Sequence, residues 1–254
     1  MLILEVGINH FGKPYEAKKF LDFFLNSKFT HLSFMIQTAQ FYKNFENKIN
    51  FKLTNSFYKK AILLAHKKKK KIGLAVCDPI SFGEVSNINF DFYKLLSISI
   101  NDKLLINALN NKRKDVYISL GKGNNKDISK CINSFSNKKK LKLVYTSMSY
   151  DPKDINLKRI EELKRKFNLE VGYGDHYSNN VAIILSNFYE PAFHFVYIKK
   201  SPKNFKRIFP DHEHAYELNY LNYLDNTIEE AKLILQKRKT NFNIKINEIK
   251  KIKY

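Results

Sequence analysis

The stretch Val171-Gly172-Tyr173-Gly174-Asp175-His176 places a glycine-containing turn, a carboxylate and an imidazole directly after a short strand-like segment. In a barrel built from alternating strands and helices, the reactive side chains lie on the loops that follow the strands. If the rest of the chain folds in this way, Asp175 and His176 are candidates for an active site.

Short β-branched or aliphatic runs alternate along the chain with longer segments of helical period, a pattern typical of parallel strands joined by helices. We expect strands at 2–6, 30–36, 72–76, 93–98, 115–119, 141–145, 170–172 and 193–198. Helices are expected at 15–26, 56–69, 103–110, 127–135, 157–167 and 216–237, with an irregular connection at 77–92. Eight such units in 254 residues predict an α/β fold, a (β/α)8 TIM barrel over residues 1–237, rather than an open doubly wound sheet.

The composition is strongly basic, with 45 Lys and Arg against 24 Asp and Glu and a formal net charge of +21. Such a charge favours nucleic acid, an anionic membrane surface or an anionic substrate as a partner. The lysines are spread along the whole chain, however, and no nucleic-acid recognition motif accompanies them. We therefore expect no specific nucleic-acid partner. The basic tail 238–254 is predicted to be either an extra element packed on the barrel or a loosely ordered end.

The two cysteines, Cys77 and Cys131, lie far apart, and the chain opens with only a short apolar run. This pattern favours a reducing compartment, so we expect a cytoplasmic protein. No stretch approaches the roughly 20 apolar residues that a membrane span requires.

Polar side chains follow most of the predicted strands. They are Glu5, Asn9, His10, Gln37, Thr38, Lys94, Ser97, Ser119, Gly121, Ser147, Ser149, Tyr150, Asp175 and His176. A ring of Lys, Ser and glycine backbone donors suits a phosphate and a carboxylate, and a His beside an acid suits a divalent metal. Gly121-Lys122-Gly123 lacks the spacing of a nucleotide-binding P-loop. His10 and His31 are expected to be structural or surface residues, and His66 is expected to face solvent.

Seven segments, in order along nearly the whole chain, resemble the motifs of the sialic acid synthase family. They are Glu5 to Gly12, Gln37-Thr38, Lys94 to Ser97, Ser119-Leu120-Gly121, Tyr150 to Leu157, Gly172 to His176, and Pro210-Asp211-His212. The family condenses phosphoenolpyruvate with an N-acyl-hexosamine of mannosamine type, giving a nonulosonic acid and phosphate. The resemblance implies that this chain is such an enzyme, or descends from one.

The resemblance also implies roles for individual residues. Glu5, Gln37 and His176 would be catalytic, and His176 would bind Mn or Mg. Lys94, Ser97, Ser119 and Ser147 would bind phosphoenolpyruvate, and Asn9, Tyr150 and Asp211 would bind the sugar.

Several departures from the family pattern bear on the activity. Met35 stands where the family has a lysine, and Phe11 replaces an asparagine. A second metal-binding His of the family, in a Glu-Lys-His-Phe segment, aligns with the stretch from Val196 to Lys199, which contains no His. A divalent metal is therefore expected to be weakly bound or lost, unless His194, His212 or His214 supplies the missing ligand. The alternative is a catalytically impaired homologue that acts as a binding or partner protein.

The family usually adds an antifreeze-like domain that covers the sugar site of the partner subunit. We expect no such domain in this chain, which leaves a homodimer of another kind or a separate lid protein as partners.

Overall fold

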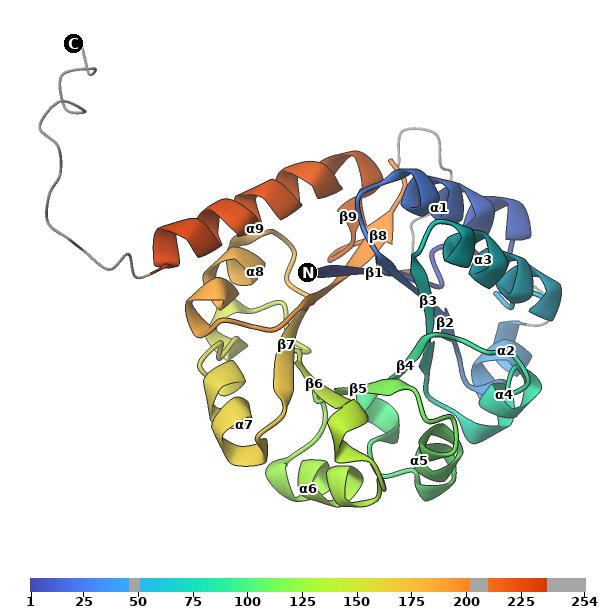
Figure 1. Ribbon diagram of the computed structural model, residues 1–254, viewed down its shortest axis with the longest axis horizontal. Helices are drawn as coiled ribbons and strands as arrows, with labels where there is room; N and C mark the ends of the chain where they lie inside the picture. Colours follow the sequence, from blue (N-terminus) through green and yellow to red (C-terminus); the bar gives the residue numbers. More distant parts are fainter. Residues whose placement is uncertain (46–50, 202–209, 237–254) are drawn as a thin grey trace, which may run out of the picture.

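The computed structural model describes residues 1–45, 51–201 and 210–236. Its centre is a closed barrel of parallel strands in the order β1 to β8, with β1 paired to β8 (Figure 1). The strands are β1 Leu2–Gly7, β2 His31–Ile36, β3 Lys71–Val76, β4 Phe92–Leu95, β5 Asp115–Ser119, β6 Leu141–Tyr145, β7 Glu170–Asp175 and β8 His194–Lys199. The predicted (β/α)8 barrel is confirmed, since all eight expected strands appear; β5 and β6 have the predicted bounds and the other six differ at one or both ends.

Helices surround the barrel (Figure 1). They are α1 Pro14–Asn26, α2 Ala39–Phe45, α3 Asn55–Lys67, α4 Pro79–Glu84, α5 Lys103–Asn110, α6 Asn125–Asn133, α7 Arg159–Phe167, α8 Val181–Ser186 and α9 Leu221–Leu235. The side chains of Thr54, Asp78, Asp102 and Asn124 cap the first turns of α3, α4, α5 and α6 by accepting backbone N–H bonds. None of the described helices is both long and apolar enough to cross a membrane.

The helix predicted over 216–237 is wrong at its start. Tyr216–Glu217 forms a short strand, β9, which pairs with the end of β8, and a 3-10 turn then leads into α9. Tyr216 is held in extended form because its hydroxyl donates to Asp175 Oδ2 at 2.5 Å. A contact distant in sequence therefore overrides the local preference for helix. Lys237 and the basic tail lie outside the described residues.

Two strand ends differ from the prediction by three residues. β7 continues to Asp175, so the segment read as a turn is strand, and His176 is the first residue beyond it. Gly174 permits this close packing, because a Cβ there would lie 2.4 Å from Thr146 Oγ1. β4 ends early at Leu95, and Ser97 begins a 3-10 turn instead of lying in the strand.

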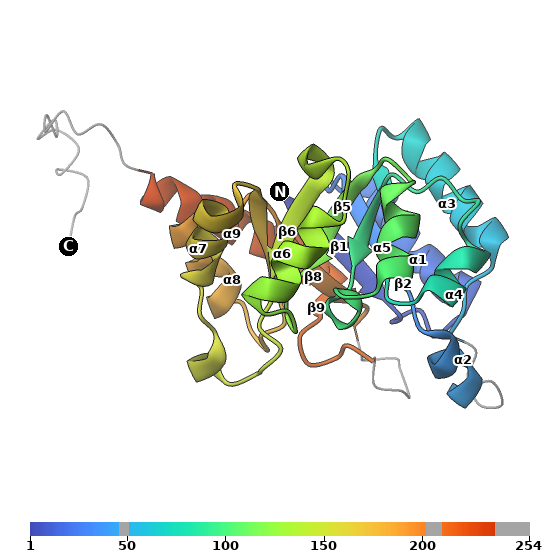
Figure 2. The same cartoon turned by 90° about the horizontal axis from the view of Figure 1, so that it is seen from below.

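The strands fix where a site can form. The segments that follow β2 and β8, namely α2 and β9, lie on the side of the barrel opposite the amino terminus (Figure 2). We call this end of the barrel, where the strands have their carboxyl ends, the mouth. The barrel interior below the mouth is filled by an apolar cluster of Ile3, Phe92, Tyr117, Val144, Phe193 and Phe195. Chemistry is therefore confined to the carboxyl ends of the strands, as in other barrels of this kind.

Candidate active site

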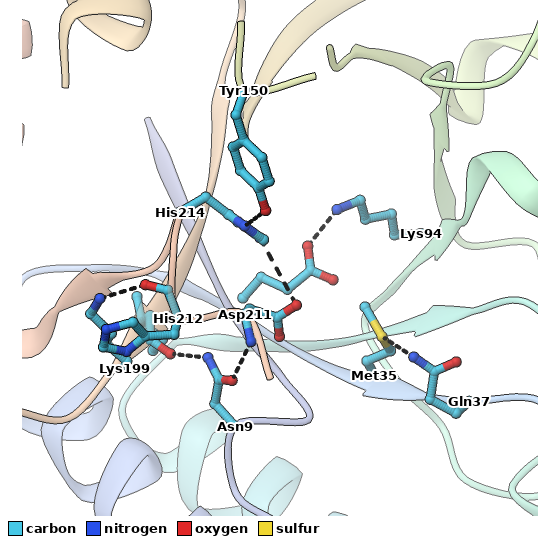
Figure 3. Close-up of polar contacts among 11 residues, drawn as sticks. Asn9, Met35, Gln37, Lys94, Tyr150, Lys199, Asp211, His212 and His214 are labelled. Atoms are coloured by element: carbon cyan, nitrogen blue, oxygen red, sulfur yellow. Dashed lines mark hydrogen bonds and ion pairs between the residues drawn. The ribbon is translucent and has the colours of Figure 1, made fainter. Parts of the chain in front are cut away.

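A buried ion pair lies at the centre of the barrel mouth. Lys94 Nζ, from β4, donates to Glu5 Oε2, from β1, and the two side chains are 3% and 0% exposed (Figure 3). Lys94 Nζ also lies 4.5 Å from the centroid of the Phe195 ring. The second carboxylate oxygen, Glu5 Oε1, is buried without a hydrogen-bond partner among the described residues. The structure thus brings a predicted catalytic residue against a predicted phosphoenolpyruvate-binding residue.

Asp211 reaches this pair from the loop after β8. Its backbone N–H donates to Asn9 Oδ1 at 3.2 Å, and Asn9 Nδ2 donates to the carbonyl of Ile198 at 2.9 Å (Figure 3). Gly7 provides the space for the Asp211 side chain, because its φ is +56° and a Cβ there would lie 2.6 Å from Asp211 Oδ2. Burial raises the pKa of Asp211 to about 7, and the nearby Glu5 carboxylate adds to the effect. Asn9 therefore joins the backbone of Asp211 to that of Ile198 near the end of β8.

Three rings pack together beside Asp211. The ring of His214 stacks on His176, with centroids 4.5 Å apart and planes 20° apart, and Tyr197 meets both rings edge-on. Tyr150 OH lies 3.1 Å from His214 Nδ1 (Figure 3). Burial lowers the pKa of His214 to about 4, and it lowers the pKa of His176 well below its ordinary value. Both imidazoles are therefore neutral at pH 7.

The prediction that His194 could replace the missing metal ligand is wrong. His194 Nε2 lies 3.0 Å from Ser186 Oγ in α8, so the side chain points away from the barrel interior into the helix layer. Ile198, four residues on, is also buried in the cluster between sheet and helices. The residue of β8 that faces His176 is Tyr197, one position before Ile198, which aligns with the His of the family's Glu-Lys-His-Phe segment. Successive residues of a strand face opposite sides of the sheet. His194 and Ile198 therefore share the helix side of β8, and Tyr197 lies on the other side.

The described residues supply only part of a metal site. Among them, no group of three or more His, Cys, Asp or Glu side chains could hold an ion. His176 and His214 stack with their planes 20° apart, which offers at most two imidazole ligands, whereas a catalytic metal usually has three protein ligands. The metal at His176 stays a prediction.

The β2 side of the mouth is apolar. Met35 belongs to a buried cluster with Ile8, Phe11, Phe51, Ala75, Tyr197 and Ala215. Gln37 Nε2 donates to Met35 Sδ at 3.3 Å, so this predicted catalytic amide rests against the thioether (Figure 3). This cluster contains no Lys or Arg of β2 that could bind an anionic ligand together with Lys94.

The predicted serines divide into two groups. Ser97, in the 3-10 turn after β4, and Ser119, at the end of β5, are both buried, and a Cβ at Gly121 would lie 3.5 Å from Ser97 Oγ. Ser147 instead lines a cavity of about 480 Å³ between the loops after β5 and β6, together with Ser149, Asp154 and Arg159. Neither Glu5 nor Lys94 lines that cavity.

Asp175 faces away from the mouth. It is fully buried and accepts hydrogen bonds from Tyr173 OH, Tyr177 N and Tyr216 OH. Burial raises its pKa to about 6, although these donors partly oppose the shift. Asp175 thus ties β7 to β9 and fixes the strand end that carries His176.

We expect this carboxyl to make stability depend on pH. Its folded pKa of about 6 exceeds the ordinary 3.8, so the folded protein binds the extra proton between these values. The free energy of unfolding should therefore fall as the pH rises from about 4 to 6, by at most about 3 kcal/mol from this group. Denaturant unfolding of wild type and Asp175→Asn at pH 5 and 8 isolates this effect from the other titrating groups. Equal pH dependence in the two proteins would contradict it.

The arrangement of two residues of the site was not predicted from the sequence. Tyr197 carries no motif, and its position opposite His176 follows only from the strand register. His214 was one of several histidines considered for a metal, and its stacking on His176 depends on β9 holding the loop.

Comparison with known proteins identifies the family. The model of the NeuB family matches residues 23–240, which is most of the chain. A segment of 88 residues is 33% identical to pseudaminic acid synthase of Campylobacter jejuni subsp. jejuni serotype O:2 and covers 33% of this chain and 26% of that protein. The segment thus spans about a quarter of that relative's length.

Two solved structures share the fold. N-acetylneuraminic acid (sialic acid) synthetase from Leptospira borgpetersenii serovar Hardjo-bovis superposes with a TM-score of 0.83 at 21% identity, over 98% of this chain and 90% of that one. A putative spore coat polysaccharide biosynthesis protein E from Chromobacterium violaceum gives 0.80 at 14% identity, over 98% and 80%. The resemblance predicted from the motifs is confirmed, and the chain belongs to the NeuB family.

Proposed function

We propose that this chain condenses phosphoenolpyruvate with an N-acyl-hexosamine of mannosamine type, forming a nonulosonic acid and phosphate. The observation that carries the proposal is the Glu5–Lys94 pair, buried at the mouth of a NeuB-family barrel beside Asp211. Apolar residues of similar volume often stabilise a protein as well as a buried ion pair does. A pair kept at this point, with Glu5 Oε1 unpartnered among the described residues, is better explained by a polar ligand.

Lys94 supplies the positive charge for an enol phosphate. Its ammonium has three donors, so it can hold Glu5 and still donate to a phosphate or carboxylate oxygen. Ser97 and Ser119, at the ends of β4 and β5, add hydroxyl donors on the same side. Ser147 lines the separate cavity between the loops after β5 and β6, so it would contact the same ligand only across those loops.

The reaction forms one carbon–carbon bond and breaks one carbon–oxygen bond. C3 of the enol phosphate attacks the sugar aldehyde, whose π electrons move to its oxygen. Water then adds at C2 and its proton goes to the new alkoxide. The C2–O bond to phosphate breaks, the proton of the remaining C2 hydroxyl leaves with the phosphate, and C2 becomes the ketone. Glu5 and Gln37 would lie nearest the reacting carbons, while Tyr150 and Asp211, positioned by Asn9, would contact the sugar.

A catalytically impaired family member is the second candidate. Met35 lies in an apolar cluster where the family has a lysine, and β8 does not supply the family's second metal-binding His, so that His176 stacks on His214 from the next loop. Both observations favour this candidate. Such a protein would bind phosphoenolpyruvate or a partner without turnover. A cytoplasmic location, and a homodimer or a separate lid protein as partner, stay predictions under either function.

Calorimetric titration of phosphoenolpyruvate, followed by phosphate release with a panel of N-acyl-hexosamines, separates these functions. An enzyme should show saturable binding and sugar-dependent release. His176→Ala should abolish the release and retain phosphoenolpyruvate binding, whereas His66→Ala, at an exposed histidine, should change neither. Binding without release from any sugar would favour the impaired homologue. Absence of binding would refute both.

A further inference from the structure

A layer of polar side chains lies directly above the apolar cluster that fills the barrel. Alternate residues of a strand face the same side, so the residue two positions beyond a member of that cluster also faces the barrel interior. Two positions beyond Ile3, Phe92, Tyr117, Val144 and Phe195 stand Glu5, Lys94, Ser119, Thr146 and Tyr197. Four of these five belong to the site described above, and Thr146 is the one without an assigned role.

The neighbouring strand shows that Thr146, one residue beyond β6, keeps this inward direction. Gly172 faces the interior, because a Cβ there would lie 2.2 Å from the ring of Phe193, and Gly174 lies two residues further along β7. A Cβ at Gly174 would lie 2.4 Å from Thr146 Oγ1 and 3.0 Å from Val144 Cγ1. The Thr146 hydroxyl therefore occupies, on the inner side of the barrel wall, the space that a side chain at position 174 would fill.

The hydroxyls on either side of Thr146 have partners of their own. Tyr145 packs against the core between sheet and helices, and its hydroxyl accepts a hydrogen bond from the backbone N–H of Asn156 at 2.9 Å. Ser147 Oγ accepts one from the backbone N–H of Ser149 at 3.3 Å, within the same loop. Of these three consecutive hydroxyls, that of Thr146 is directed toward the barrel interior.

Thr146 also borders open space. Thr146 and Gly121 both line the cavity of about 480 Å³ between the loops after β5 and β6. Gly121 lies beside Ser97, since a Cβ at Gly121 would lie 3.5 Å from Ser97 Oγ. The cavity thus borders the polar layer near the ends of β4 and β6, where an anion could reach the hydroxyls.

We propose that Thr146 donates a hydrogen bond from its hydroxyl to an oxygen of the phosphate or carboxylate of phosphoenolpyruvate, together with Lys94 and Ser119. This inference rests on the proposed condensation, because it concerns the same anion. The Lys94 ammonium has three donors, so it can hold Glu5 and still share the anion with two hydroxyls. Thr146 thereby takes the role that the motif resemblance gave to Ser147.

Calorimetric titration of phosphoenolpyruvate into Thr146 variants tests this role. Thr146→Val keeps the shape of the side chain and removes its hydroxyl, so binding should weaken about 10-fold, the value of one hydrogen bond to a charged group. Thr146→Ser restores the hydroxyl and should bind within about twofold of the wild type. Thr227→Val in α9, whose hydroxyl donates to the carbonyl of Tyr223, is the matched control and should leave binding unchanged.

Inorganic phosphate and pyruvate, titrated separately, show which end of the ligand Thr146 contacts. A loss of affinity for phosphate assigns the hydroxyl to the phosphate group, a loss for pyruvate assigns it to the carboxylate, and either supports the proposal. Wild-type affinity for phosphoenolpyruvate in Thr146→Val would overturn it, and so would a loss confined to Ser147→Ala. Thermal unfolding checks the fold, and if Thr146→Val did not fold, Thr146→Ala against Thr146→Ser would make the same comparison.

The outcomes separate this inference from the proposed condensation. The titrations need no sugar, so the condensation can fail in the phosphate-release assay while binding that depends on Thr146 still stands. Conversely, a Thr146→Val protein that binds phosphoenolpyruvate and releases phosphate like the wild type would leave the condensation in place and exclude Thr146 from the anion site.

Discussion

Replacing Lys94 with Met is expected to lower the free energy of unfolding by about 3–5 kcal/mol, because it leaves Glu5 buried without its cation. The loss should shrink at low pH, where protonation neutralises the abandoned carboxylate. The same change should weaken phosphoenolpyruvate binding by about 10- to 100-fold, the value of one charged hydrogen bond. Denaturant unfolding and calorimetric titration measure the two effects separately.

A double variant separates stability from binding. Glu5→Gln with Lys94→Met removes both charges and should recover most of the lost stability, while phosphoenolpyruvate binding stays weak. The exposed pair of Lys18 and Asp22 in α1 is the matched control, and Lys18→Met should cost less than about 1 kcal/mol. If Lys94→Met were as mild as Lys18→Met, the central pair would not be desolvated in solution. Unchanged phosphoenolpyruvate binding in Lys94→Met would exclude Lys94 from the anion site.

The barrel could be predicted from the sequence because its signal is local and repeated. Each strand is a short apolar run, and most of the helices between them carry an apolar stripe at helical spacing. The motif order also placed Glu5, Lys94 and Asp211 at strand ends, and the closed barrel brings them together. Residues at the carboxyl ends of parallel strands meet whenever the strands form one closed sheet.

The side that each residue faces could not be predicted, because it depends on register. A shift of one residue exchanges the two faces of a strand, and this is how Ile198 was aligned where Tyr197 faces the site. His194 failed as a ligand for the same reason. The extended backbone at Tyr216 depends on Asp175, 41 positions earlier in the chain. Periodicity carries no information about such a contact.

The apolar cluster at the mouth was also hidden from the sequence. Phe11 has a positive φ of 52°, a conformation that asparagine tolerates better than most residues. The ring is nevertheless buried, 6.1 Å from the ring of Phe51, a residue 40 positions later. The substitution that departs from the family motif is thus coupled to a distant aromatic residue, which a single motif cannot reveal.

The largest effect on stability outside the site is expected at Gly172 in β7. A Cβ there would lie 2.2 Å from the ring of Phe193, which cannot retreat because Tyr117 and Phe195 meet it edge-on at 5.0 and 5.9 Å. Gly172→Ala should therefore destabilise the barrel by about 3 kcal/mol, the upper range for overpacked cores. In a chain of this size, that corresponds to a fall in Tm of about 6–12 °C, measurable by thermal unfolding.

Removing the clash from the other side tests this cause. Phe193→Leu makes room for the new methyl group, so the double variant should lose less stability than the sum of the two single variants. Gly83→Ala in α4 is the matched control, because nothing lies within 4 Å of its added Cβ. A glycine-to-alanine change in an open helical position should be neutral or stabilise by up to about 1 kcal/mol. If the losses of the two single variants simply added, the clash with Phe193 would not be their cause. Gly172 would then be required by the backbone of β7 and not by the aromatic side chains beneath the site.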